Sequence, residues 1–115
     1  MQKMALDEAE LTAEHGIHIG RWSQYAGLDG LPFDAMWFEV PAHGRSATDI
    51  HPEIELAVVV DGVATFTVDG EDTTAPRGTA ILLQPGESHV VHAHDAPVRV
   101  LSLYWLPDGA PVDVA

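Results

Sequence analysis

Side chains that commonly bind divalent metal ions gather in two short segments of this sequence. In the first, Asp49, His51 and Glu55 precede or enter an apolar run that ends at Gly62. In the second, His89 follows a turn signal and opens another apolar run. Two imidazoles and one or two carboxylates, gathered inside a small β-barrel, would form a site for a divalent metal. The strands that carry these four side chains therefore decide whether the site can form.

One carboxylate of this set is predicted to face the core. Two apolar segments, 54–60 and 63–68, flank Asp61-Gly62, a dipeptide typical of two-residue hairpin turns. Such a hairpin pairs Val60 with Val63, and alternate residues then share a face. The more apolar face would carry Glu55, Ala57, Val59, Ala64, Phe66 and Val68. A second turn at Asp69-Gly70 would send the chain back, and a carboxylate on the apolar face requires a partner or a metal.

Strand alternation selects His89 as the inward ligand of the second segment. Val91 and Ala93 share its face, whereas His92 and His94 fall on the opposite face. The histidines that we expect on the surface or in loops are His15, His18, His43, His92 and His94.

A proline interrupts the strand alternation of the first segment. Asp49 and His51 have the strand parity of Glu55, but Pro52 predicts a kink or a bulge between them. Glu53 is an alternative carboxylate ligand, although its position beside the proline predicts that it faces solvent.

The remaining segments are typical of an all-β protein. Residues 15–22, 33–40 and 99–105 have strand patterns, and glycines and prolines separate them at short intervals. The first residues carry only a weak apolar stripe at helical spacing, which predicts a short helix or a frayed end. We expect an N-terminal arm at 1–14, a single domain at 15–107 and a C-terminal tail at 108–115.

Composition excludes several classes of protein. A chain of 115 residues suffices for one domain with one modest core. Eighteen Asp and Glu against five Lys and Arg give a formal charge of −13, which opposes binding to nucleic acid or anionic membranes. No apolar run has the length of a membrane span, and the first residues lack a secretory-signal pattern. Without cysteine, disulfides and thiolate ligands are excluded, and we expect a cytoplasmic location.

The first segment resembles the first motif of the cupin superfamily. That motif is roughly a glycine, a spacer, His-x-His, three or four residues, a glutamate, six residues and a glycine. His51, Glu55 and Gly62 match it, and Asp49 stands where the first histidine is usual.

The second segment resembles the second cupin motif, which is a glycine, five residues, Pro-x-Gly-x-x-His, three residues and an asparagine. Gly78, Gly86 and His89 match in spacing. Gln84 replaces the usual proline, and Ala93 replaces the asparagine. Two motifs in the right order imply a cupin-type jelly-roll β-barrel or sandwich with a short N-terminal arm.

The resemblance also implies one divalent metal, held by His51, Glu55 and His89 with Asp49 as a fourth ligand. Two imidazoles and a carboxylate suit non-haem Fe(II), and the second carboxylate favours Mn(II). Zn(II) and Ni(II) could bind the same ligands. The alternative interpretation is a metal-free pocket rim in which the two histidines are satisfied polar residues.

Five side chains alternate suitably to line a substrate pocket inside such a barrel. They are Met36, Phe38, Phe66, Ser102 and Tyr104. The alternative for most of them is ordinary core packing. Arg45 could steer a substrate carboxylate at the pocket mouth, or it could be a solvated loop residue.

Three classes of function stay open, and the leading one is a small metal-dependent enzyme. It would act on a small organic metabolite, as an oxygenase or as a non-redox isomerase or cyclase. The second is a ligand-binding module, because residues 51–62 resemble the sensory domain of arabinose-type regulators. Such regulators carry a separate DNA-binding region, for which the sequence shows no pattern. The third is a metal-free structural or binding cupin.

We also expect a homodimer. Residues 54–60 are apolar on both faces apart from Glu55, which predicts that the outer face is covered as well. Residues 15–22 could cover it, within one subunit or across two.

Overall fold

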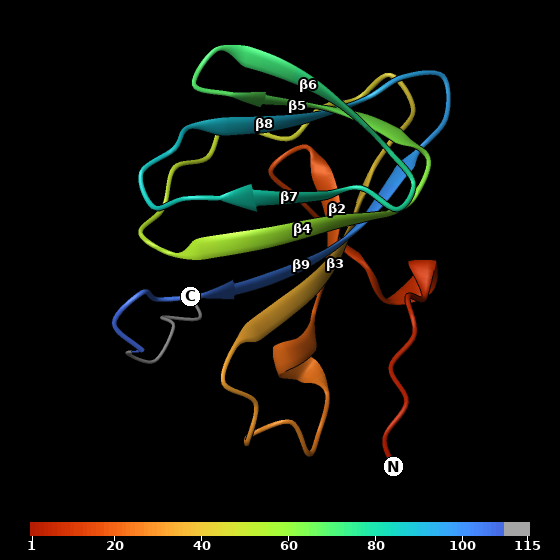
Figure 1. Ribbon diagram of the computed structural model, residues 1–115. Helices are drawn as coiled ribbons and strands as arrows, with labels where there is room; N and C mark the ends of the chain where they lie inside the picture. Colours follow the sequence, from red (N-terminus) through yellow and green to blue (C-terminus); the bar gives the residue numbers. More distant parts are fainter. Residues whose placement is uncertain (110–115) are drawn as a thin grey trace.

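The computed structural model describes residues 1–109 and contains two antiparallel β-sheets (Figure 1). The larger sheet has the order β1-β2-β3-β9-β4-β7, and the smaller has the order β6-β5-β8. The strands are β1 (Thr12–Glu14), β2 (Ile17–Arg21), β3 (Asp34–Val40), β4 (Ile54–Asp61), β5 (Val63–Val68), β6 (Glu71–Pro76), β7 (Ala80–Leu83), β8 (His89–Ala93) and β9 (Val98–Trp105). The predicted all-β class is confirmed. The expected C-terminal tail lies outside the described residues from position 110 onward.

One hydrophobic core lies between the two sheets, and strand alternation creates it. Ala57 and Val59 on β4, Val100 on β9 and Phe66 on β5 are each at most 1% exposed. Val91 on β8 packs in the same cluster, so both sheets contribute to it. The predicted inward face of β4 and β5 is therefore confirmed.

The hairpin predicted at Asp61-Gly62 is wrong. β4 pairs with β7 and β9, whereas β5 pairs with β6 and β8, so Val60 and Val63 are not partners. Gly62, with φ +83°, turns the chain from one sheet into the other, and the backbone carbonyl of Pro97 leaves no room for a side chain there. Because strand parity survives this corner, the inward residues of β4 and β5 meet across the core instead of within one sheet.

The second predicted turn, at Asp69-Gly70, is a two-residue hairpin. Val68 of β5 pairs with Glu71 of β6, and both turn residues have positive φ, at +48° and +83°. Two consecutive residues with positive φ match the right-handed twist of the paired strands. The turn that sends the chain back is therefore confirmed.

The N-terminal segment is more ordered than its sequence predicts. A 3-10 helix, η1 (Glu8–Glu10), precedes β1, and β1 pairs along β2 at the edge of the larger sheet. A second 3-10 helix, η2 (Trp22–Gln24), follows β2. No helix within residues 1–109 is long and apolar enough to cross a membrane.

The expected cover of β4 is not provided by β2 of the same subunit. β3 and β9 separate β2 from β4 in a single sheet, so β2 lies beside these strands and not over the outer face of β4. Val60 and Leu82 remain 38% and 53% exposed. The homodimer stays a prediction.

The corner at Gly62 generates the first testable prediction, a comparison of Gly62→Ala with Gly70→Ala. Both glycines have φ +83°, so each alanine carries the left-handed backbone cost of about 1–2 kcal/mol. A Cβ at Gly62 would also lie 2.5 Å from the carbonyl oxygen of Pro97, whereas a Cβ at Gly70 meets nothing within 4 Å. Gly62→Ala should therefore lower the free energy of unfolding by about 1–3 kcal/mol more than Gly70→Ala in urea titrations. Equal losses would show that the corner is not tightly packed.

Candidate metal centre

The centre of the site is the buried carboxylate of Glu55 on β4, which is only 7% exposed. Its Oε1 atom lies 3.0 Å from Nε2 of His51 and 3.7 Å from Nε2 of His89. Its Oε2 atom accepts a hydrogen bond of 2.9 Å from the hydroxyl of Ser102 on β9. The predicted inward orientation of Glu55 therefore brings it between both histidines.

Asp49 reaches the site because its segment runs along the free edge of β8. Its backbone N–H donates to the carbonyl of His89 at 3.0 Å, and the N–H of His89 donates back at 2.9 Å. Further along, the N–H of Ser46 donates to the carbonyl of Val91, and the hydroxyl of Ser46 accepts from the N–H of Val91. Two distant parts of the chain thus carry their ligand-type side chains to one place.

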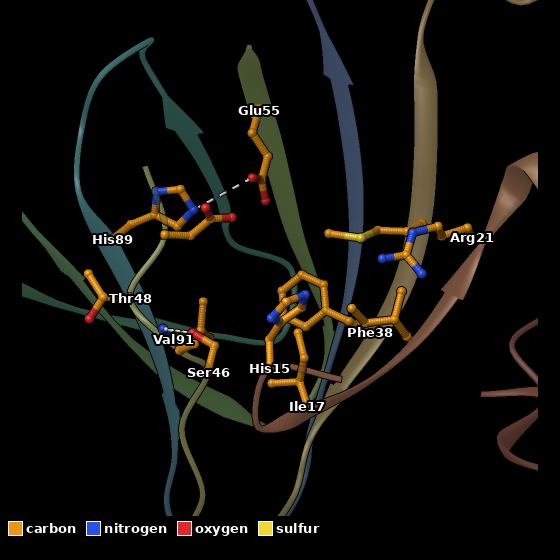
Figure 2. Close-up of a pocket in the computed structure, with 13 residues that line it drawn as sticks. His15, Ile17, Arg21, Phe38, Ser46, Thr48, Glu55, His89 and Val91 are labelled. Atoms are coloured by element: carbon orange, nitrogen blue, oxygen red, sulfur yellow. Dashed lines mark hydrogen bonds and ion pairs between the residues drawn. The ribbon is translucent and has the colours of Figure 1, made fainter. Parts of the chain in front are cut away.

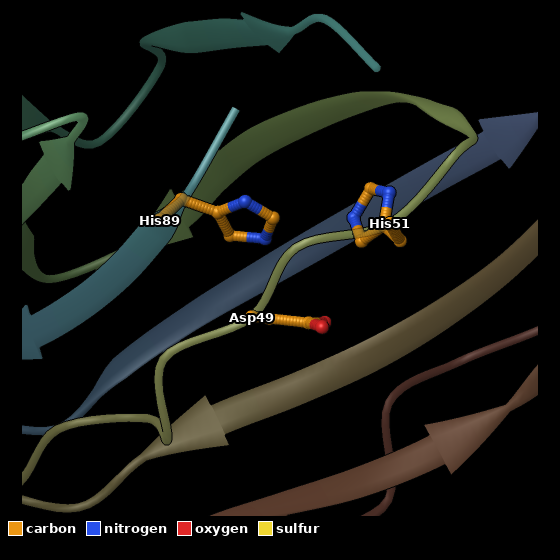
Figure 3. A group of neighbouring side chains, drawn as sticks. All are labelled: Asp49, His51 and His89. Carbon is orange, nitrogen blue, oxygen red and sulfur yellow. The ribbon is translucent and has the colours of Figure 1, made fainter. Parts of the chain in front are cut away.

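Asp49, His51 and His89 form a group that could hold a metal ion (Figure 3). Each offers one ligand atom, and the three atoms lie within 4.8 Å of one another. The two imidazole rings are nearly perpendicular, with centroids 5.0 Å apart. The four predicted ligands are therefore neighbours, with Asp49 in the compact group and Glu55 in contact with both histidines.

Backbone carbonyls orient both imidazoles in the same way. Nδ1 of His51 lies 3.1 Å from the carbonyl oxygen of Glu53, and Nδ1 of His89 lies 3.1 Å from that of Glu87. A carbonyl oxygen only accepts, so each Nδ1 must carry the proton. In the neutral rings the lone pairs are then on the two Nε2 atoms, which face Glu55. Metal-binding histidines are typically oriented by such a bond on the other ring nitrogen.

The contact between His51 and Glu55 favours the protonated form of His51. Nε2 of His51 faces a carboxylate oxygen, which cannot donate, so a hydrogen bond there requires a proton on Nε2. This bond to Glu55 raises the pKa of His51, burial opposes the increase, and the charges of Glu55, Asp49 and Glu53 add to it. A proton on Nε2 would therefore compete with a cation for the same place.

The alternative ligand Glu53 lies on the other side of His51. Its carboxylate is 3.9 Å from Nδ1 of His51, the nitrogen that faces away from Glu55, and its side chain is 19% exposed. The predicted orientation toward solvent is thus only partly right, and Glu53 supports the ring through its backbone carbonyl.

A cavity of about 230 Å³ opens beside the site (Figure 2). Asp49, Glu55 and His89 form part of its wall. Its apolar wall consists of Ile17, Ile19, Met36, Phe38 and Val91. A small organic molecule in this cavity would lie against the candidate ligands.

The five residues predicted for the substrate pocket lie in three environments. Met36 and Phe38 line the cavity. Phe66 is buried in the core, and Ser102 is fully buried where it donates to Glu55. Tyr104 stands opposite Glu55 in the register of β4 and β9, and burial is the main cause that raises its pKa to about 12. The phenol therefore stays neutral well above physiological pH.

Two ionisable residues of the cavity wall, Arg21 and His15, were not predicted for the site. Arg21 continues the inward alternation of Ile17 and Ile19 on β2, a signal that could have identified it. His15 was expected on the surface, and its exposed side chain lines the cavity from the turn between β1 and β2. Arg45, which was considered for the pocket mouth, is exposed and does not belong to the cavity wall within residues 1–109.

The histidines of β8 follow the predicted alternation. His89, Val91 and Ala93 are buried, and His92 is intermediate. His94 follows the strand, where its Nε2 lies 2.8 Å from the hydroxyl of Thr65 outside the core. Of the three histidines, only His89 lies among the candidate ligands.

The donor set matches what a divalent metal requires. Both imidazoles present Nε2 to one point, two carboxylates adjoin them, and Ser102 orients one carboxylate. Mixed imidazole and carboxylate ligands suit Fe(II), Mn(II), Zn(II) and Ni(II). The residues that could hold the ion are Asp49, His51, Glu55 and His89.

Comparisons with known proteins agree with this architecture. An uncharacterized protein of Streptomyces coelicolor is 28% identical over 108 residues, which cover 94% of this chain and 99% of that protein. The crystal structure of a cupin 2 conserved barrel domain protein from Salinispora arenicola has a TM-score of 0.85 and 24% identity, and covers 95% of this chain and 92% of that one. The polyketide cyclase RemF from Streptomyces resistomycificus has a TM-score of 0.69 and 18% identity, with 90% and 79% covered.

A family model places the chain directly. The model described as the cupin domain matches residues 36–104, which begin in β3 and end in β9 and include all four candidate ligands. The smaller sheet, strands β4 and β7 of the larger sheet, both candidate histidines and the buried glutamate lie within this span. The chain belongs to the cupin domain family.

Proposed function

We propose that this protein is a small metal-dependent cupin enzyme that acts on a small organic metabolite. The convergence of two imidazole Nε2 atoms on one buried carboxylate, at the wall of a cavity, is the observation that carries this proposal. Both rings are oriented by backbone carbonyls that leave Nε2 for a cation. Core packing alone does not require such matched orientation.

The ion would be held by His51, His89 and Glu55, with Asp49 beside it. Fe(II) and Mn(II) suit this mixture of imidazole and carboxylate ligands best, and Zn(II) or Ni(II) could also bind. When bound, the ion would supply Lewis-acid polarisation of a carbonyl or enolate, or activation of oxygen. The reaction would be an oxygenation or a non-redox isomerisation or cyclisation, and the likeness to a polyketide cyclase supports including the latter.

The chain's own residues would bind and orient the substrate. Apolar side chains such as Phe38 and Met36 would exclude water from the cavity. The hydroxyl of Ser102 would hold Glu55 in one rotamer by its hydrogen bond to Oε2. Tyr104, whose pKa is raised to about 12, would stay neutral and add no negative charge beside Glu55.

A non-catalytic small-molecule-binding or structural cupin is the second candidate. The observation that favours it is the satisfaction of Glu55 without a metal, since His51 and Ser102 bond to its two oxygens. Metal content separates the two candidates first, and turnover separates them second. A metal-loaded protein that converts a metabolite, and a His89→Ala protein that does not, would support the enzyme.

Removal of single ligands should abolish metal binding. We expect about one divalent ion per chain in the unmodified protein reconstituted with Fe(II), Mn(II), Ni(II) or Zn(II), measured by emission spectrometry. His51→Ala and His89→Ala should lose nearly all of it, because each removes an Nε2 donor. Asp49→Ala should weaken binding or change the preferred metal.

The matched control is His92→Ala, which changes a histidine of the same strand on the opposite face. It should retain full metal content. Full occupancy in His89→Ala would place the metal elsewhere, and no metal in any reconstituted sample would leave the binding module as the leading account.

Ser102→Ala should weaken metal binding without removing a ligand. The change deletes the hydroxyl that donates to Oε2 of Glu55, and loss of such an outer partner typically costs about 10- to 100-fold in affinity. Competition with a chelator would measure the dissociation constant. Ser23→Ala, at an exposed position in η2, serves as the control. An unchanged constant for Ser102→Ala would mean that its hydrogen bond to Glu55 does not support a ligand of the ion.

Metal affinity should fall with decreasing pH, and the decrease should begin above the ordinary range of histidine. The metal needs the lone pair of Nε2, and the hydrogen bond to Glu55 raises the pKa of His51 above its usual value of about 6.5. Below the raised pKa, one bound proton must leave per ion, so the apparent affinity should fall about tenfold per pH unit. Calorimetric titrations across pH, with an NMR titration of His51 in EDTA, would test this. An affinity independent of pH down to about 6.5 would contradict it.

A further inference from the structure

Among the described residues 1–109, the cavity wall contains one arginine, Arg21, and no lysine. It ends β2, where it continues the inward positions of Ile17 and Ile19. Its side chain is 31% exposed, and its guanidinium donates to Glu14, from Nη1 to Oε2 at 2.7 Å and from Nη2 to Oε1 at 3.1 Å. A guanidinium has five N–H donors, so three remain for another acceptor.

Arg21 and the candidate metal ligands lie on different sides of the cavity. In the larger sheet, β3 and β9 separate β2 from β4, which corresponds to about 14 Å between the two backbones. Figure 2 shows Arg21 on one side of the lining residues and His89 on the other. Met36 and Phe38, which also line the cavity, are on β3 between β2 and β4.

We propose that Arg21 is the specificity-determining residue of the cavity, and that the ligand is a small carboxylate with an apolar body. The inference rests on the proposed function, because the end of the ligand remote from Arg21 would face Asp49, Glu55 and His89. The volume of about 230 Å³ is below the roughly 300–1,000 Å³ typical of drug-sized ligands, so the body is small. Arginine binds carboxylates through its planar fork of donors.

The charge distribution makes Arg21 the element on which recognition of an anion depends. The chain carries a formal charge of −13, and the cavity wall itself contains Asp49 and Glu55. Among the side chains of the cavity wall, Asp49 and Glu55 repel an anion, whereas the guanidinium of Arg21 attracts it. Glu14 orients that group by two hydrogen bonds and also offsets its charge, which keeps the affinity for an external carboxylate low.

The test uses three carboxylates with apolar bodies of different size, butyrate, benzoate and cinnamate, each beside its neutral amide. Binding to the full chain is followed by NMR titration, both in EDTA and after metal reconstitution. At least one acid should bind more tightly than its amide. Arg21→Gln should weaken that acid about 10- to 100-fold and leave the amide unchanged. Arg45→Gln, at an exposed arginine outside the cavity, should change neither.

Glu14→Gln distinguishes recognition from a structural role. It removes the offsetting charge but retains an oxygen acceptor for Arg21, so the acid should bind about two- to fivefold more tightly. If the Arg21–Glu14 pair only stabilises the edge of the sheet, Glu14→Gln should weaken binding as Arg21→Gln does. Weaker binding by Glu14→Gln, equal binding of acids and amides, or no binding of any acid would each overturn the proposal.

The same samples separate this inference from the proposed function. Metal content of Arg21→Gln, measured by emission spectrometry, should equal that of the unmodified protein, because Arg21 is not a ligand. Acid binding in EDTA that depends on Arg21 would support the anion site even if no metal bound. A metal-loaded protein in which acid binding is insensitive to Arg21→Gln would keep the metal site and refute the role of Arg21.

Discussion

The burial of one carboxylate, that of Glu55, is the constraint on which the site depends. Removing a carboxylate from water costs several kcal/mol even after the protein relaxes, so its oxygens must find partners. Ser102 comes from β9, His89 from β8 and His51 from the segment before β4, and all three approach the carboxylate. A single unfavourable group thus ties both sheets and a connecting segment together, at the place where a cation would be most strongly attracted.

On the inward faces of the strands, polar residues lie toward one end and apolar residues toward the other. The site and the core therefore share one interior space. The register aligns Arg21, Met36 and Ser102 in one row of inward-facing residues of the larger sheet. The neighbouring inward-facing row contains Ile19, Phe38 and Val100. On β8 the order is His89, Val91 and Ala93, and on β4 it is Glu55, Ala57 and Val59. One end of the barrel is therefore polar and open to a cavity, while the other is close-packed and supplies stability.

Long-range backbone pairing brings the ligands together. Asp49 adjoins His89 because residues 44–49 pair with β8 as an additional edge segment, forty residues away in the chain. The carbonyls of Glu53 and Glu87 then orient the two imidazoles. Both imidazoles are thus oriented by the backbone, whereas Glu55 is held by the side chain of Ser102, and together these contacts favour a fixed ligand arrangement.

Local backbone geometry made part of the fold and of the candidate site predictable from the sequence alone. Alternation along a strand has a period of two residues whatever the strand pairs with, so the inward positions of Glu55, Phe66 and His89 followed from parity. The turn at Asp69-Gly70 followed from local backbone preferences, and the all-β class followed from turn spacing. Pairing partners are different, because they depend on contacts between distant segments that no local pattern specifies. Only the tertiary structure therefore decided that β4 and β5 belong to opposite sheets, that Asp49 lies against His89, and that Arg21 and His15 face the cavity.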